Sequence, residues 1–178
     1  MRVLIICDRM AGMSPRDASE VIGRAFEDEG AQVAVIPVGA GGPDLTDAMS
    51  TLEPDARVVQ PDAHTDLPDV LRAGAGKLVV DASKMYTPSL EELSGIWTPS
   101  VLEEIRDRLH QRELVFVTPI GDVQYGLTGL DGRIAQLGRE QGLELAQTIE
   151  QDTRANSWAQ SIGVDPTHAG TGALGGLG

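Results

Sequence analysis

This sequence of 178 residues has little cysteine, few aromatic residues and a shortage of positive charge. The single Cys7 cannot form an internal disulfide, which favours a reducing compartment, and its place in the apolar run VLIIC favours a buried thiol. Aromatic residues make up 3% of the chain, so aliphatic side chains must supply most of the core. No apolar run approaches the roughly 18 residues needed to span a membrane. These features predict a cytoplasmic globular protein.

Basic side chains are outnumbered, because 14 Lys and Arg residues face 27 Asp and Glu residues, for a net charge of −13. A field of that sign repels nucleic acid and anionic membranes, and we expect neither as a partner. It also opposes ATP unless Mg²⁺ and a few cations offset it. His64, His110 and His168 are scattered without metal-ligand spacing, so we interpret them as surface residues.

Apolar runs of strand length alternate with helical patterns. The predicted strands cover 2–7, 32–37, 77–81 and 114–117, and the first is typical of a strand buried on both faces of a parallel sheet. The predicted helices cover 14–30, about 44–52, 98–111, 131–141 and 143–162. The first helix has Ser14 as its N-cap and an apolar face of Ala18, Val21, Ile22, Ala25 and Phe26.

This alternation predicts an α/β fold: a doubly wound, mostly parallel sheet with helices on both faces. The length fits one domain over 1–178. Its stretch 53–113 is irregular, with short strands and loops over 53–76, and 165–178 is a glycine-rich tail.

The stretch VIPVGAGGPDLTDAM (35–49) predicts a strand that turns through a glycine loop into a helix, where α/β enzymes often bind phosphate or substrate. The loop nevertheless has no charged or nucleophilic side chain before Asp44. The tail has a loose phosphate-loop pattern, but no helix follows its glycines, so a flexible terminus and a ligand loop both remain open.

Three segments together resemble the bacterial glycerate kinase family, whose members phosphorylate D-glycerate with ATP. They are VLIICDRMAGMSPRDASEVIGRAF, the glycine loop IPVGAGGPDLTDAM, and GDVQYGLTGLDGRIAQLGREQGLE followed by GVDPTHAGTGALGGLG. The family's counterparts are D-S-F-K-G-S in the first segment, V-P-M-A-D-G-G-E-G-T-x-D-A-L, and C-D-V-x-N-P-L with a later G-A-G-A-A-G-G-L-G. The resemblance covers more than half of the chain.

The matching positions imply a substrate site and a phosphate or nucleotide loop. The implied substrate-binding residues are Asp8, Arg9, Gly12, Gly41, Gly42, Asp47 and Asp122. The implied phosphate or nucleotide loop contains Gly170, Gly172, Gly175 and Gly176. The backbone-shaping residues Gly129 and Gly142 also match. No catalytic residue is assigned, and the metal ligands stay unknown.

Most charged positions of the family's motifs are replaced. Ala11 stands at a lysine, Ala40 at an aspartate, Pro43 at a glutamate, Tyr125 at an asparagine and Gln141 at a lysine. The family's G-I-G-G-S-A-T-N-D-G-G segment has no counterpart, and the family continues beyond the position of Gly178. We therefore expect either a fragment of a longer protein or a reduced relative.

The remaining charged residues allow two interpretations. Asp8 and Asp122 each follow a strand end, where they could hold metal-bound water or simply cap the next turn. Arg9 could bind a carboxylate through two nitrogens or be a solvated surface residue. Lys84, Arg133 and Arg139 are weaker candidates, and the N-cap role explains Ser14 without any catalytic part.

Two main functional hypotheses follow. The first is a degenerate family member with little or no kinase activity, which acts as a ligand-binding or regulatory module for a glycerate-like molecule or a nucleotide. The alternative is an active ATP-dependent glycerate kinase, with ATP and Mg²⁺ as cofactors. Different small-molecule chemistry on the same scaffold is a third hypothesis. An incomplete sheet edge would favour a homo-oligomer.

Overall fold

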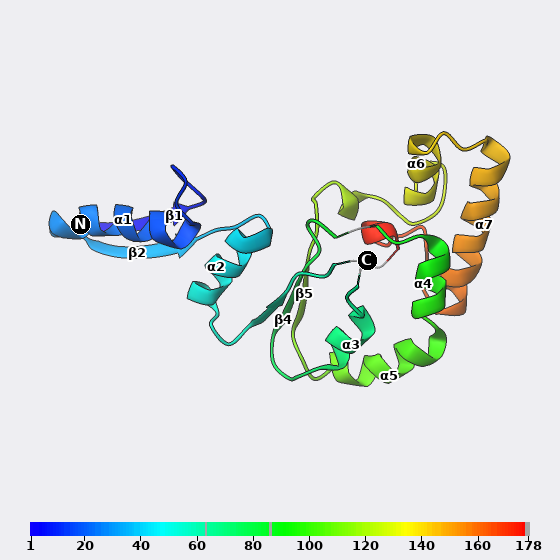
Figure 1. Ribbon diagram of the computed structural model, residues 1–178, viewed down its shortest axis with the longest axis horizontal. Coiled ribbons are helices and arrows are strands. Elements are labelled where there is room, and N and C mark those ends of the chain that lie inside the picture. The colour runs from blue at the N-terminus through cyan, green and yellow to red at the C-terminus, as the bar shows by residue number, and fades with distance from the viewer. Residues whose placement is uncertain (63, 86, 177–178) are drawn as a thin grey trace. The chain divides into compact units, whose positions relative to one another are not determined.

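The computed structural model describes residues 1–62, 64–85 and 87–176. It is an α/β protein with one two-stranded and one three-stranded sheet, both parallel, and helices along the connections (Figure 1). This is an incomplete doubly wound fold, which confirms the predicted fold class. The chain divides into two compact units, the first made of Met1–Gln60, Gly76–Lys84 and Arg112–Val117 and the second of the remainder. The single domain over 1–178 stays a prediction.

The first unit contains both sheets. In chain order its elements are β1 (Arg2–Cys7), α1 (Pro15–Asp28), β2 (Gln32–Pro37), α2 (Gly42–Leu52), β3 (Arg57–Val59), β4 (Leu78–Asp81) and β5 (Leu114–Val117). Strands β1 and β2 pair residue for residue from Arg2 opposite Gln32. The predicted start of the first helix is confirmed, because the Ser14 hydroxyl accepts a hydrogen bond from the Asp17 amide at 3.2 Å.

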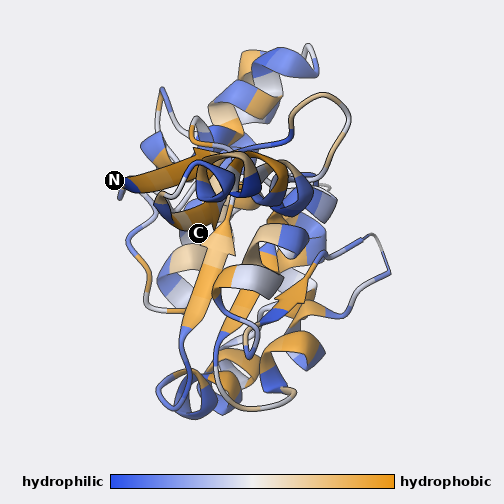
Figure 2. Cartoon of the chain, turned by 90° about the vertical axis from the view of Figure 1, so that its left-hand side faces the viewer, coloured by the Kyte–Doolittle hydropathy of each residue, from blue (hydrophilic) through white to orange (hydrophobic). Residues whose placement is uncertain are grey.

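Only one face of the β1–β2 sheet is covered among the described residues. Ile5 and Cys7 pack with Ala18 of α1, which confirms the buried thiol. The alternate residues Leu4 and Ile6 are 59% and 63% exposed, although the strand beginning at the N-terminus is largely hydrophobic (Figure 2). The prediction that the first strand is buried on both faces is therefore wrong for the described chain, because α1 covers a single face.

The predicted apolar face of α1 is likewise only partly buried. Ala18 is fully buried, whereas Val21 and Phe26 are 55% and 38% exposed. The buried residues of α1 instead include Ser19 and Gly23. Gly23, which has no side chain, lets the helix lie close to β2. A Cβ atom there would lie 3.3 Å from a Val35 methyl carbon. Small residues therefore set the distance between helix and sheet here.

The second sheet has the order β3-β4-β5, and its central strand is buried along its whole length. Leu78 and Val80 are fully buried, as expected for a central parallel strand. Lys77, just before this strand, pairs with Glu53 at 2.7 Å and Glu113 at 3.0 Å. Hydrogen bonds to these two glutamates raise the pKa of Lys77.

The second unit is helical. Its elements are α3 (Leu67–Arg72), α4 (Leu90–Ile96), α5 (Pro99–Leu109), the 3₁₀ turn η1 (Asp122–Gln124), α6 (Arg133–Glu140), α7 (Leu145–Ser161) and the 3₁₀ turn η2 (Ala173–Gly175). A cluster of Leu127, Ile134, Ala155 and Ala159 forms its core, with Trp158 packed against it. Helix α3 corrects the prediction of only strands and loops over 53–76, and α4 was not predicted. Among the described residues, no helix is long and apolar enough to cross a membrane.

The one-sided burial of β1 gives a matched pair of substitutions. Ile5→Ala should lower the free energy of unfolding by about 2–5 kcal/mol, because it leaves a cavity under α1. Ile6→Ala, one position along the same strand but exposed, should cost less than about 1 kcal/mol. Urea unfolding followed by circular dichroism measures both. Equal losses would contradict the exposure of the second face.

Candidate functional site

The glycine loop between β2 and α2 forms the bend that the sequence predicts. Gly41 and Gly42 have φ angles of 151° and 66°, which side chains of L residues rarely allow. A Cβ atom on Gly41 would also lie 2.1 Å from the Ser83 hydroxyl oxygen. The backbone of the loop therefore approaches the chain after β4 too closely for any residue other than glycine at position 41.

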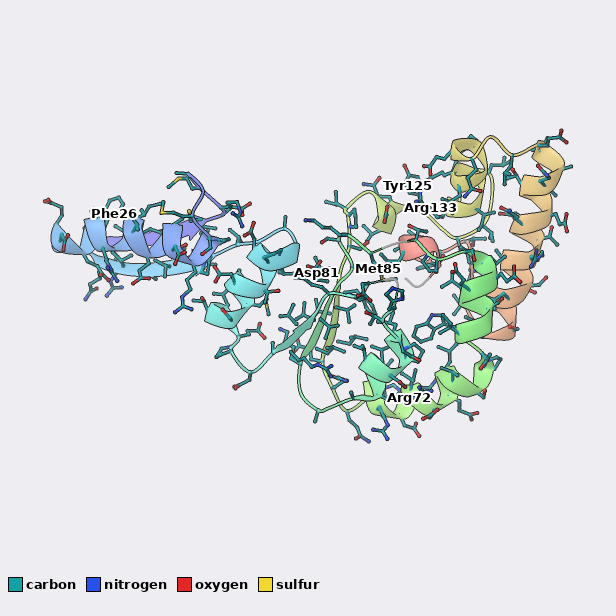
Figure 3. The ribbon with its side chains drawn as sticks, viewed as in Figure 1. Phe26, Arg72, Asp81, Met85, Tyr125 and Arg133 are labelled. Atoms are coloured by element: carbon teal, nitrogen blue, oxygen red, sulfur yellow. The ribbon has the colours of Figure 1, made fainter. Side chains whose placement is uncertain are left out.

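The N-terminus of α2 is occupied by an acidic side chain of the protein itself. Asp81, at the end of β4, is 4% exposed, and its Oδ2 accepts a hydrogen bond from the Gly42 amide at 2.5 Å (Figure 3). Its Oδ1 accepts from the amide and the hydroxyl of Ser83 at 3.1 and 2.6 Å. Asp81 thus takes the place that the helix dipole offers to an anion.

The rest of the first turn of α2 offers few free donors. Pro43 has no amide hydrogen, so it offers no donor to a ligand. Gly39 packs closely against the peptide bond between Asp44 and Leu45. A Cβ atom on Gly39 would be 2.4 Å from the Leu45 amide nitrogen. An external phosphate would have to displace the Asp81 carboxylate to bond the Gly42 amide.

Arg9 is paired with a carboxylate at the same helix end. Its Nε and Nη2 donate to the two oxygens of Asp44 at 2.8 and 2.5 Å. Of the two interpretations left open for Arg9, this geometry is the bidentate one, and the partner is internal. The hydrogen bond from Arg9 lowers the pKa of Asp44, and the same contact raises the pKa of Arg9.

Six of the seven predicted substrate-binding residues belong to the first unit. Asp8 accepts a hydrogen bond from the amide of the next residue, Arg9, at 2.7 Å, and both interpretations of Asp8 stay predictions. Asp47 accepts from the Arg16 amide at 3.0 Å and so ties α2 to the first turn of α1. Gly12 has a φ of 80° in the loop that carries Arg9. Asp122 begins η1, which belongs to the second unit.

We did not predict Asp81 and Asp44 as site residues. Asp44 lies within the quoted loop, and its place in the first turn of α2 was a visible signal. Asp81 follows a buried strand, but it is 39 residues from its partner Gly42. The one sequence signal for Asp81 was its position at the end of a predicted strand.

The tail glycines use their amides inside the second unit. Gly170 and Gly172 both donate to the Tyr125 carbonyl, at 3.0 and 3.1 Å. Gly175 donates to the Gly172 carbonyl at 3.2 Å and Gly176 to the Ala173 carbonyl at 3.0 Å. None of these four amides is free to bind a phosphate, and a role in phosphate binding stays a prediction.

The tail is packed rather than free as far as position 176. Ala173 and Leu174 are 4% and 5% exposed, which corrects the expectation of a flexible terminus for this part. A Cβ atom on Gly172 would lie 2.4 Å from the Gly126 carbonyl oxygen, so close backbone packing explains that glycine. Leu177 and Gly178, the end of the predicted tail, lie outside the described residues.

The weaker candidates are placed differently from one another. Lys84 is near the α2 N-terminus: its Nζ would be 3.6 Å from a Cβ atom on Gly42, and its charge helps to lower the pKa of Asp44. Arg133 pairs with Glu140 at 3.6 Å, and Arg139 donates to the Leu130 carbonyl at 3.3 Å. Within the described ranges, no group of three or more His, Cys, Asp or Glu side chains could hold a metal ion.

Comparison with known proteins gives one informative match. No family model and no curated protein matches the chain. A crystal structure from Salmonella typhimurium LT2, of a protein provisionally named glycerate kinase 2, matches with a TM-score of 0.66. This chain shares its fold. The match covers 100% of this chain and 69% of the glycerate kinase 2 chain, at 16% sequence identity. At that identity the likeness establishes the fold, and it agrees with the resemblance drawn from the motifs.

The role of Asp81 can be tested by stability. Asp81→Ala should lower the free energy of unfolding by about 2 kcal/mol, because it removes the helix cap and leaves the buried Gly42 amide without its partner. The control Asp55→Ala, at an exposed position of the same unit, should change it by less than about 0.5 kcal/mol. Chemical denaturation compares the two. Equal stability of both variants and the parent protein would rule out this anchoring role.

The Arg9–Asp44 pair predicts a pH effect. Because the pKa of Asp44 is lowered in the folded protein, the pair stabilises the fold at neutral pH, and this contribution disappears as the pH falls through the lowered pKa. Carboxyl-detected NMR should show Asp44 titrating below the ordinary aspartate range. In Arg9→Gln its midpoint should move back up, and an unchanged midpoint would mean that Arg9 is not the cause.

Proposed function

We propose that this chain is a glycerate-kinase-like protein with little or no kinase activity, which acts as a ligand-binding or regulatory module. The observation that carries the proposal is the carboxylate of Asp81 on the Gly42 amide. In an open α/β sheet this helix end is where a substrate or phosphate group binds. In this chain the protein's own acid fills it.

The cations near the loop support the same conclusion. Phosphoryl transfer depends on positive groups that neutralise the transferring phosphate. The family's first-loop lysine is Ala11 here, and the neighbouring Arg9 is already neutralised by Asp44. Lys84 is the remaining cation that we place close to the α2 N-terminus. With a net charge of −13, the protein lacks the positive field that would attract ATP.

The alternative is an active ATP-dependent glycerate kinase. The fold shared with the protein named glycerate kinase 2 supports it, as do the acidic side chains of Asp8, after β1, and Asp47, in α2. One or two carboxylates with the phosphates of ATP are enough to bind Mg²⁺. Phosphoryl transfer also needs a cation at the phosphates. For Arg9 to serve as that cation, ligand binding must displace it from Asp44. We also keep association of two copies as a proposal, since both outer edges of the β1–β2 pair lack a strand partner among the described residues.

A coupled assay for ADP, with the purified chain, ATP, Mg²⁺ and D-glycerate, tests the proposal. We expect no glycerate-dependent ADP above the no-enzyme control, from protein shown to be folded by a cooperative urea transition. Calorimetric titration with Mg²⁺–ATP, sensitive to a dissociation constant of about 1 mM, should also show no binding, which leaves a regulatory role or a ligand other than a nucleotide. Glycerate-dependent turnover that disappears in Asp8→Asn would overturn the proposal and establish the kinase.

A further inference from the structure

The outer edge of β1 is open in the part of the chain that the structure describes. Strand β1 pairs with β2 along one edge, and no other described strand joins this sheet (Figure 1). Leu4 and Ile6 of β1 are also more than half exposed, on the sheet face opposite α1. An unpaired edge presents backbone amides and carbonyls that a further strand can bond. The edge of β1 is therefore a place where another chain can extend the sheet.

The bonds to β2 show which backbone groups of β1 face outward. The Met1 carbonyl accepts a hydrogen bond from the Gln32 amide at 2.9 Å, and the Cys7 carbonyl accepts one from the Val38 amide at 2.9 Å. In a parallel pair, alternate residues of a strand bond the same neighbour. The odd-numbered residues of β1 therefore bond β2, and the backbone groups of the even-numbered residues point to the open edge. These residues are Arg2, Leu4 and Ile6.

Helix α1 extends an apolar surface toward the same edge. Ala18 packs with Ile5 and Cys7 of β1. Gly23 faces β2 instead, because a Cβ atom on it would lie 3.3 Å from a Val35 methyl carbon. The residues three and seven positions after Ala18 lie on the Ala18 side of the helix, toward the open edge of β1. They are Val21 and Ala25, and both are exposed.

A second copy of the chain would cover the strand edge and the helix side together. If the two β1 strands pair, the four strands run in the order β2–β1–β1–β2, and a two-fold axis perpendicular to the sheet places both α1 helices on one face. Strands lie about 4.8 Å apart, and each α1 lies over its own β1 and β2. The two helix axes would then be about 10 Å apart, which is the distance between packed helices. A lone strand would leave Val21 and Ala25 uncovered.

The charges at the two ends of β1 favour one antiparallel register. Arg2 begins the strand, and Asp8 follows its last residue. Outward-facing residues must meet outward-facing residues. When the two-fold axis passes between the two copies of Ile5, Arg2 of each copy lies opposite Asp8 of the other. Leu4 of each copy lies opposite Ile6 of the other. Opposite charges and apolar pairs directly across two strands stabilise their pairing.

We propose that two copies of this chain associate through the outer edges of their β1 strands, antiparallel, to form one four-stranded sheet with the α1 helices packed side by side. This contact gives a definite surface to the association of two copies proposed above. It closes with two molecules, because each chain has one β1 edge. The contact does not depend on whether the chain transfers phosphate, so its test and the kinase assay are separate.

Sedimentation velocity of the full chain measures the association. We expect a species with twice the mass of one chain, which dissociates on dilution. Hydrogen exchange locates the contact, because the amides of Leu4 and Ile6 should be protected where the dimer forms and exchange rapidly after dilution. A monomer at all concentrations up to about 1 mM, or a dimer in which these two amides stay unprotected, would overturn the proposal.

Exchanging the two charges tests the register. Arg2→Glu places like charges opposite each other at both ends of the contact, and it should weaken the dimer by about tenfold. Asp8→Arg should have a similar effect. The double variant Arg2→Glu, Asp8→Arg restores opposite charges, and its dissociation constant should return to within about threefold of the parent value.

A control variant makes the same change of charge elsewhere. Arg154→Glu alters an exposed residue of α7 in the second unit and should leave the dissociation constant unchanged. A cooperative urea transition establishes that each variant is folded. A double variant that associates no more tightly than the two single variants would contradict the antiparallel pairing of β1 with β1.

Discussion

The carboxylate of Asp81 on the amide of Gly42 is the contact on which the glycine-loop site depends. It joins the end of β4 to the start of α2, although the two residues are 39 positions apart in the sequence. Because Ser83 bonds the same carboxylate, the chain after β4 lies against the loop, and Gly41 has no room for a side chain. The anion site of a helix N-terminus has thereby become an internal structural contact.

The acids around α2 have their partners within the protein. Around α2, the internal acids Asp81 and Asp44 are each bonded to donors of the protein, and the cation Arg9 is used up in the process. In a chain of net charge −13, no surplus of positive charge attracts an anion to this helix end.

Several elements could be predicted from the sequence because local signals mark them. The apolar runs gave β1, β2, β4 and β5 closely, and Ser14 marked the start of α1. Burial could not be predicted in the same way, since an apolar run does not say what covers it, and Ile6 is exposed. Helices α3 and α4 span six and seven residues, too short for a clear helical period, although the Ser89–Glu92 capping box was visible. The glycine bend could likewise be predicted, whereas the role of Asp81 depends on tertiary contact.

The most direct test of a filled α2 N-terminus follows the backbone amide signals of Gly41 and Gly42 in the NMR spectrum of the full chain. D-glycerate and inorganic phosphate are added separately up to saturating amounts. We predict that both signals stay where they are, because Asp81 and the close contact with Ser83 occupy the space. A saturable shift of the Gly42 amide with either ligand would contradict it, and would show that this helix end still binds anions.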